Sequence, residues 1–340
     1  MAKKQDGEWQ RRESWPRIAV LGAGAVGCYF GGMLARAGAP VILIGRKQHV
    51  EAINRNGLLL ETSDFQQKIQ VSASTDVSAA RDAEIVLFCV KTMDTEEAAK
   101  CLAACILPNA LVLSLQNGAD NVERIRSASG IDAIAAVVYV AAAMAGPGHV
   151  KHHGRGDLVL GDLPGRPETA EPRPDRLEEI SAAFASCGVP CRVSENIQGE
   201  LWTKMIINCA YNAISALGRA RYRQIGSNPW TRQLMIQVIG EAVAVAGAAG
   251  VRLPGSNMTE AGLKVAETMA NATSSTAQDL ARGKRTEIDS LNGYLVRRGK
   301  DFGVATPVNQ TLHALVKLLE ESVQSNAVFT AAGQQVANGL

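Results

Sequence analysis

A chain of 340 residues with 46% apolar and 4% aromatic side chains is long enough to build two domains, each with its own core. The formal net charge of +2 lacks the strong basic excess of nucleic-acid binders, so no nucleic-acid partner is expected. No run of about 18 apolar residues is free of charges or turn signals, so we expect no membrane span and a cytoplasmic protein.

Residues 1–16 are polar and contain charges of both signs. They lack the apolar core of a signal peptide and the acid-free composition of a transit peptide. We interpret this segment as a disordered leader.

Short β-branched runs alternate with Ala-rich helical stretches between residues 17 and 195, a pattern typical of βαβ units around a parallel sheet. The strands that this pattern predicts are Ile18–Leu21, Val41–Ile44, Ile85–Val90, Leu111–Leu115 and Ile134–Val140. Shorter strands around Leu158–Leu160 and Cys191–Val193, separated by a helix from about Leu177 to Ser186, are expected to finish the sheet as antiparallel additions. This region is predicted to form a Rossmann-type α/β domain.

The strand signal disappears in residues 196–340. Long stretches with apolar residues at helical spacing take its place at Trp202–Leu217, Trp230–Ala249 and Thr276–Arg298. The second domain is therefore predicted to be all-α.

The first predicted strand runs into a G-x-G-x-x-G motif formed by Gly22, Gly24 and Gly27. The first glycine suits the tight turn, the second lets the backbone approach a pyrophosphate, and the third allows close contact between helix and sheet. The N–H groups of Ala25 and Val26 open the following helix, whose positive end favours phosphate. We interpret this as a dinucleotide site; the alternative is a glycine-rich turn without a ligand.

Gly45-Arg46-Lys47 follows the second predicted strand, where NAD enzymes place an acidic residue for the ribose 2′-hydroxyl. A guanidinium at this point binds a 2′-phosphate by paired, charge-assisted hydrogen bonds. Arg46 therefore favours NADPH as the cofactor, and the alternative is a solvated basic loop. The role of Lys47 stays open.

Lys91 and Asn117 follow two further strand ends, on the edge where open α/β sheets bind ligands. By position alone, either residue could also be an ordinary turn residue.

Lys204, Asn208 and Asn212 recur every four residues in a mostly apolar helical stretch. This spacing places them on one side of the helix. An unpaired polar group in a core costs roughly 1–3 kcal/mol, so the stripe indicates a ligand. The alternative is a helix whose polar side meets solvent or another domain.

Ser275 and Gln278 have the spacing of a capping box, so Ser275 could simply cap a helix. Glu287 lies 12 residues after Ser275, about 18 Å along a continuous helix. The two residues could share a ligand only if the chain bends near Ser275.

Together these residues resemble the ketopantoate reductase family over roughly residues 17–310. The matching motifs, in the family's order, are G-x-G-x-x-G, Val90-Lys91, Gln116-Asn117-Gly118, the Lys204/Asn208/Asn212 helix, Ser274-Ser275 and Thr286-Glu287-Ile288-Asp289. The resemblance implies a Rossmann-type domain and a helical domain that bring NADPH and 2-dehydropantoate together in a cleft. The implied reaction yields pantoate for pantothenate biosynthesis.

By motif match, Lys204 resembles the catalytic lysine of this family and Glu287 its essential carboxylate. The same comparison assigns Asn117, Asn208, Asn212 and Ser275 to the substrate. It assigns Lys91, together with Asn117, to the cofactor. An ammonium such as that of Lys204 can stabilise and protonate the oxygen that gains charge when hydride reaches a keto carbon.

Three other interpretations remain open. A paralogous 2-keto acid reductase would explain why Val140–Ala145 is less polar than the matching segment of many relatives, and why Ala213 replaces a proline common there. A 3-hydroxyacid dehydrogenase explains Lys204 and Asn208 but not Glu287. A non-catalytic NADPH sensor would need only the glycine motif. The oligomeric state is also open, a homodimer included.

The histidine-rich segment His149–His153 lacks a carboxylate or cysteine partner at a coordinating spacing. The seven cysteines also lack the spacing of a zinc site and are expected to be structural thiols. No metal is predicted.

Overall fold

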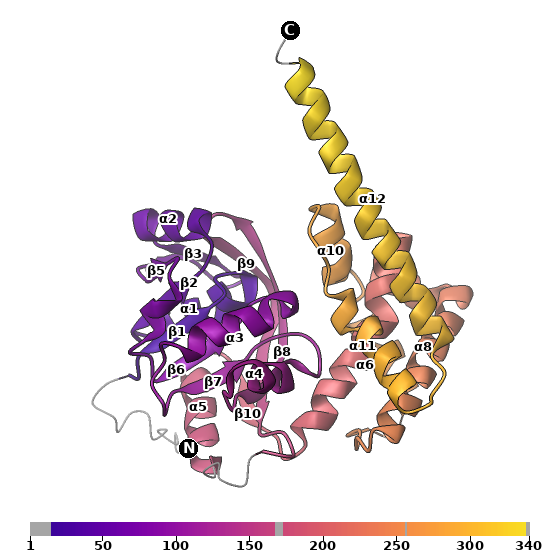
Figure 1. Ribbon diagram of the computed structural model, residues 1–340, viewed down its shortest axis with the longest axis horizontal. Helices are drawn as coiled ribbons and strands as arrows, with labels where there is room; N and C mark the ends of the chain where they lie inside the picture. Colours follow the sequence, from indigo (N-terminus) through magenta and orange to yellow (C-terminus); the bar gives the residue numbers. More distant parts are fainter. Residues whose placement is uncertain (1–14, 167–172, 256, 338–340) are drawn as a thin grey trace. The chain divides into compact units, whose positions relative to one another are not determined.

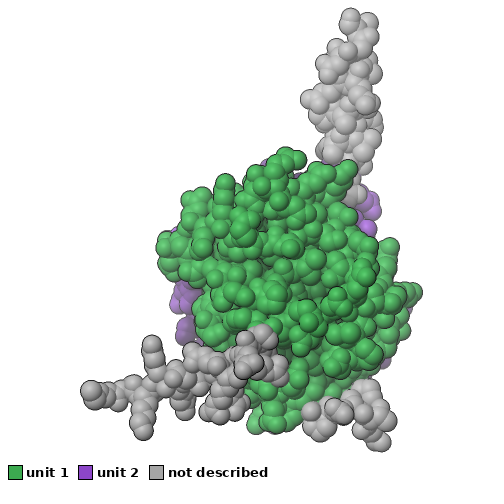
Figure 2. Space-filling view, turned by 90° about the vertical axis from the view of Figure 1, so that its left-hand side faces the viewer, with its two compact units in different colours: residues 1–197 green, residues 198–340 purple. Residues whose placement is uncertain are grey.

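The computed structural model describes residues 15–166, 173–255 and 257–337, so most of the leader expected at residues 1–16 lies outside the described residues. The chain divides into two compact units, residues 1–197 (unit 1) and residues 198–340 (unit 2), which are coloured separately in Figure 2. None of the helices in the described residues combines the length and the apolar composition that a membrane span requires.

Unit 1 is built on a mixed sheet whose six parallel strands have the Rossmann order β5-β2-β1-β6-β7-β8 (Figure 1). These strands are β1 (Ile18–Leu21), β2 (Val41–Ile44), β5 (Ser72–Ser74), β6 (Ile85–Phe88), β7 (Leu111–Ser114) and β8 (Ile134–Gly146). The direction in which successive strands are added reverses between β1 and β6, and such a switch point is where doubly wound sheets bind ligands.

The sheet continues beyond β8 with strands that the sequence predicted incompletely. Antiparallel β9 (His149–Gly161) pairs with β8, and β3 (Leu58–Glu61), β4 (Gln66–Ile69) and β10 (Cys191–Val193) complete the sheet. The strands expected at Ile134–Val140 and Leu158–Leu160 were therefore too short, and β10 pairs with β9 in parallel rather than antiparallel. Alanines and glycines weaken the strand pattern here, and the long pairing of β8 with β9 overrides it.

Helices cover both faces of this sheet. Unit 1 contains α1 (Ala25–Arg36), α2 (Lys47–Asn56), η2 (Val77–Ala80), η3 (Thr92–Asp94), α3 (Thr95–Ala103), α4 (Asn121–Ser129) and α5 (Pro174–Ser186). Phe30 of α1 meets Phe184 of α5 edge to face, with ring centroids 6.2 Å apart, in one core with Val20, Leu87 and Leu113 of the sheet. On the opposite face, α3 and α4 pack against each other (Figure 1).

Unit 2 is helical over its described residues. It contains α6 (Ile197–Gly218), α7 (Tyr222–Ser227), α8 (Pro229–Ala248), α9 (Met258–Thr268), α10 (Ser275–Ala281), η4 (Ile288–Ser290), α11 (Asn292–Asp301) and α12 (Pro307–Ala337). The continuous amphipathic stretch predicted at Thr276–Arg298 is wrong, because α10 ends at Ala281. Gly283 then takes a φ of 64°, a left-handed conformation that ends helices.

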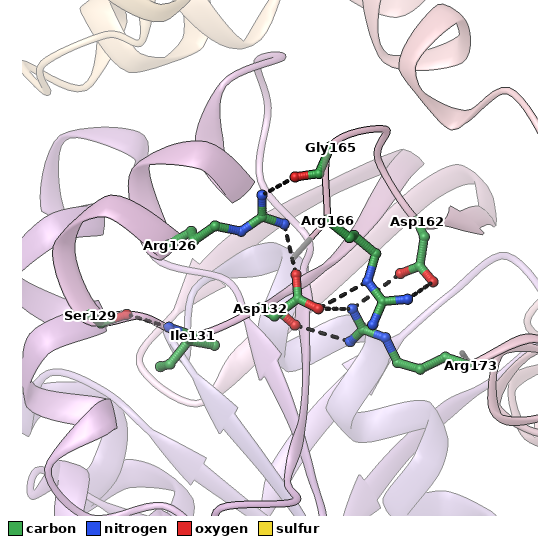
Figure 3. Close-up of polar contacts among 8 residues, drawn as sticks. All are labelled: Arg126, Ser129, Ile131, Asp132, Asp162, Gly165, Arg166 and Arg173. Carbon is green, nitrogen blue, oxygen red and sulfur yellow. Dashed lines mark hydrogen bonds and ion pairs between the residues drawn. The ribbon is translucent and has the colours of Figure 1, made fainter. Parts of the chain in front are cut away.

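An ion-pair cluster holds the start of β8 to the segment that follows β9 (Figure 3). The Asp132 carboxylate accepts hydrogen bonds from Arg126 at 2.7 Å, Arg166 at 2.9 Å and Arg173 at 2.6 Å. Arg166 and Arg173 also pair with Asp162, directly after β9. Burial raises the pKa of Asp132, but the bonds from Arg126 and Arg166 outweigh it and hold this pKa below its usual value of 3.8.

Asp132→Asn is expected to destabilise unit 1 by roughly 1–2 kcal/mol at pH 7, because the partly buried cluster loses one of its two anions while Arg166 and Arg173 keep Asp162. Since the pKa of Asp132 is lowered by folding, its ionised form stabilises the protein above pH 3.8, and this contribution is lost as the pH falls below that value. Thermal melts at pH 7 and near pH 3 should therefore show a smaller acid-induced drop in Tm for the variant. Asp64→Asn, at an exposed carboxylate, is the control and should match the wild type.

Candidate functional site

The carboxyl ends of β1 and β6 meet at the point where the strand order reverses. Gly22 directly follows β1 with a φ of 112°, and a Cβ there would lie 2.6 Å from the carbonyl carbon of Cys89. The Cys89 N–H donates to the Leu21 carbonyl at 2.7 Å. A side chain at position 22 would force the two strand ends apart, so this turn requires glycine.

The N-terminus of α1 fits an anionic group. Gly24 is the N-cap residue, and no side chain caps the helix there. A Cβ on Gly24 would meet no atom within 4 Å, whereas one on Gly27 would lie 2.2 Å from the Gly22 carbonyl oxygen. The N–H groups of Ala25 and Val26 belong to the first turn, which has no helical acceptor for them. The turn therefore combines backbone donors, the positive helix end and open space at Gly24.

Arg46 lies where β2 passes into α2. It is the N-cap residue of α2 and its side chain is exposed. The neighbouring Lys47 is also exposed, and its ammonium lies 3.8 Å from Glu51 on the same helix. Arg46 is the better of the two for binding a phosphate, because its guanidinium offers a planar pair of donors.

A buried amide ties together the loops that follow β6 and β7. Gln116 is 5% exposed, and its Nε2 donates to the Val90 carbonyl at 3.1 Å and to Thr95 Oγ1 at 2.8 Å. Its Oε1 accepts from Ser114 Oγ at 3.0 Å. Sequence reasoning treated Gln116 only as part of a motif; its signal is a polar side chain directly after a buried strand.

Lys91 and Asn117 stand in these two loops, and both are partly buried. The backbone carbonyl of Asn117 accepts from Thr92 Oγ1 at 3.1 Å and from Asn121 Nδ2 at 2.7 Å. Because Thr92 is the next residue after Lys91, this bond joins the two loops. Unit 1 therefore brings Lys91 and Asn117 to neighbouring loops on the carboxyl edge of the sheet.

In unit 2, α6 carries Lys204, Asn208 and Asn212 on one uninterrupted helix. Lys204 and Asn208 are partly buried, and Asn212 is 3% exposed. The flanking positions Met205, Cys209 and Ala210 are buried hydrophobics. The predicted polar side of the helix therefore lies at the boundary of an apolar core, and Asn212 lies inside that core.

Ser274, rather than Ser275, caps α10. The Ser274 hydroxyl accepts from the Ala277 N–H at 3.0 Å and donates to the Asn212 carbonyl at 3.1 Å, while the Ser274 N–H donates to Ser215 Oγ at 3.2 Å. The capping interpretation of Ser275 is therefore wrong, since Ser275 is the first residue of the helix and is exposed. Ser274, named above only within the Ser274-Ser275 motif, and Ser215, which the sequence did not single out, hold the start of α10 beside Asn212.

Glu287 is not on the helix of Ser275. The chain turns at Gly283, and Glu287 is partly buried as the N-cap residue of the short helix η4. The bend that a shared ligand requires is present, although it lies after α10 rather than at Ser275.

The histidine-rich segment has structural partners. His149 Nε2 lies 2.9 Å from Glu61, and the His152 ring stacks on Tyr29 with centroids 4.4 Å apart. Among the described residues, no group of three or more His, Cys, Asp or Glu side chains is arranged to hold a metal ion.

Two family models match the chain. Residues 18–165 match the model described as ketopantoate reductase PanE/ApbA, and residues 196–320 match its C-terminal counterpart. The 2-dehydropantoate 2-reductase of Pyrococcus horikoshii is 35% identical over 304 residues, which cover 89% of this chain and 97% of the relative.

Solved structures agree with these matches. The crystal structure of a PanE/ApbA family ketopantoate reductase from Ralstonia eutropha is 50% identical, with a TM-score of 0.84 over 91% of this chain and 99% of that one. A D-mandelate dehydrogenase solved with NADH and anilino(oxo)acetate is 26% identical, with a TM-score of 0.83 over 90% of this chain and 99% of that one.

Proposed function

Because the chain belongs to the ketopantoate reductase PanE/ApbA family, whose members are nicotinamide-dependent oxidoreductases, we propose that it reduces 2-dehydropantoate to pantoate with NADPH. The observation that carries this proposal is the stripe of Lys204, Asn208 and Asn212 at the edge of the α6 core. An ammonium and two amides repeated every four residues at this edge offer donors and acceptors that a polar 2-keto acid can use.

Unit 1 supplies the cofactor site in this proposal. The backbone around Gly22, Gly24 and Gly27, with the N–H groups of Ala25 and Val26, would hold the pyrophosphate. The remaining cofactor contacts are assigned to Arg46 at the 2′-phosphate, and to Lys91 and Asn117 at the carboxyl edge of the sheet. When bound, NADPH supplies the hydride.

In this proposal, unit 2 supplies the groups that stabilise negative charge on the substrate, transfer a proton to it and orient it. Lys204 would donate to the keto oxygen, stabilise the alkoxide that forms there and then protonate it. Glu287 would accept a hydrogen bond from a substrate hydroxyl. Asn208, Asn212 and Ser275, together with Asn117 of unit 1, would orient the substrate through amide and hydroxyl groups, which donate and accept without adding charge.

Arg46→Ala is expected to weaken NADPH binding by about one to two orders of magnitude and to leave NADH binding nearly unchanged, because only NADPH has the 2′-phosphate. Fluorescence titration of both cofactors measures this difference. Arg55→Ala, at an exposed arginine in the last turn of α2, is the matched control and should leave both affinities unchanged. Equal wild-type affinities for the two cofactors would contradict the choice of NADPH.

The substrate is tested by following NADPH oxidation with a panel of 2-keto acids that includes 2-dehydropantoate. We expect the highest kcat/KM with 2-dehydropantoate. A clear preference for another branched 2-keto acid would identify that acid as the substrate and leave the proposed reaction type unchanged. Reduction of NADP⁺ by 3-hydroxy acids without turnover of any 2-keto acid, or no turnover at all, would overturn the proposal.

An aryl 2-oxo acid is a second candidate substrate class. The fold matches the D-mandelate dehydrogenase as closely as the Ralstonia eutropha reductase, with TM-scores of 0.83 and 0.84. The panel should therefore include benzoylformate, the 2-oxo acid that corresponds to mandelate. The sequence identity of 50% with the ketopantoate reductase, against 26% with the mandelate enzyme, favours 2-dehydropantoate.

A further inference from the structure

The segment that carries Glu287 has little secondary structure of its own. It consists of a loop after α10 and the three-residue helix η4, in which Ser290 N–H donates to the Glu287 carbonyl at 2.9 Å. The Ile288 N–H donates to Thr286 Oγ1 at 3.2 Å. Because a single 3₁₀ turn has poor hydrogen-bond geometry, other elements must hold this segment in place.

Helix α12 provides that support from one side. Its residues Asn309, His313, Lys317 and Glu320 recur at helical spacing and so share a face. Glu320 is 5% exposed, and its Oε1 accepts from the Thr286 N–H at 2.6 Å. The Glu320 carboxylate therefore holds the backbone at Thr286, the residue directly before Glu287.

The same face of α12 also holds the residue two positions after Glu287. The Asp289 carboxylate accepts from His313 Nε2 at 2.7 Å and from Lys317 Nζ at 2.9 Å, and these two bonds lower the pKa of Asp289. Lys317 Nζ also lies 3.0 Å from Glu320 Oε2. Lys317 is thus the cation shared by Asp289, two residues after Glu287, and Glu320, which binds the backbone one residue before it.

Helix α12 is itself joined to the helix of the polar stripe. Asn292 of α11 is fully buried, and its Nδ2 donates to the Cys209 carbonyl of α6 at 3.2 Å and to Asn309 Oδ1 at 2.9 Å. Glu241 of α8 accepts from Asn309 Nδ2 at 2.7 Å and from the Val308 N–H at 2.8 Å. A chain of buried polar contacts therefore connects α6 to the support of Glu287.

We propose that Lys317 and Glu320 of α12 are positioning residues that hold Glu287 in its working place relative to Lys204. This inference rests on the proposed function and adds to it two residues that touch neither substrate nor cofactor. A displacement of about 1 Å in a reacting group costs up to roughly 100-fold in rate, so support of this kind affects kcat.

Lys317→Met tests the proposal, because it keeps the apolar stem and removes only the ammonium. We expect kcat to fall about tenfold with an unchanged Kd for NADPH. Lys317→Arg should retain most of kcat, since it keeps the charge between the two carboxylates. Lys300→Met, at an exposed lysine near the end of α11, is the matched control and should behave as the wild type.

The decisive comparison repeats Lys317→Met in a Glu287→Gln background. If Lys317 acts through Glu287, the second substitution should lower kcat less than twofold further, because the effects of residues that act as a unit are not additive. An undiminished tenfold loss in that background would overturn the proposal and indicate general destabilisation. Glu320→Gln, which keeps an acceptor for the Thr286 N–H, should show the same dependence on Glu287.

These outcomes are separable from those of the proposed function. A wild type that reduces keto acids, with Lys317→Met and Glu320→Gln variants as active as it is, overturns only the positioning role. A wild type that turns over no keto acid overturns both proposals.

Discussion

Lys204→Met is expected to lower kcat by about 10²–10⁴-fold while NADPH still binds. Methionine keeps most of the side-chain volume and removes the charge and the donors. Lys204 is the basic member of the polar stripe on α6, and the amides of Asn208 and Asn212 cannot supply a proton at neutral pH. Single-turnover kinetics, with a separate NADPH titration, distinguish lost chemistry from lost binding.

The control for this experiment is Lys264→Met, at an exposed lysine of α9, which should keep the wild-type kcat. Thermal melts of both variants should agree with the wild type, since Lys204 is only partly buried. A Lys204→Met variant with near wild-type kcat would refute the assignment. Glu287 and Lys91 would then be the next groups to test.

Gly24→Ala is expected to fold with a wild-type Tm and yet bind NADPH about 10- to 100-fold more weakly. The added Cβ meets no protein atom within 4 Å, so it costs the fold little. It would instead occupy the space through which the backbone approaches a pyrophosphate. Cofactor titration beside a thermal melt measures both quantities.

Gly27→Ala is the contrasting variant. Its Cβ would lie 2.2 Å from the Gly22 carbonyl oxygen, so we expect a loss of roughly 3 kcal/mol in the free energy of unfolding. If Gly24→Ala bound NADPH as tightly as the wild type, the glycine turn would not be the phosphate site. Equal losses of stability in the two variants would show that both glycines are needed only for packing.

Local patterns predicted the elements whose residues interact with near neighbours. The strand, glycine turn and helix around Gly22 form as expected, because the steric requirements of that turn lie within a few residues. The same holds for α6, where apolar spacing defines a long helix and the four-residue repeat from Lys204 to Asn212 defines its polar side. The roles of these residues stay predictions until the variants are measured.

The errors arose where distant partners decide the structure. The extension of β8 to Gly146 depends on its pairing with β9, against the weak strand preference of Ala141–Ala143. Ser274 caps α10 because its hydroxyl and its N–H are also bonded to Asn212 and Ser215. A capping-box pattern uses only residues close in sequence, so it does not include these distant contacts.

Short-range spacing and the order of the motifs were therefore enough to predict the Rossmann-type and helical regions, the family and the candidate residues. The contacts that support those residues became visible only in the folded chain. Gln116 joins two loops through Val90 and Thr95, and Glu320 reaches Thr286 across 34 residues. Packing decides which backbone N–H and C=O groups become buried and therefore need a protein partner. In the unfolded chain the same groups form hydrogen bonds with water.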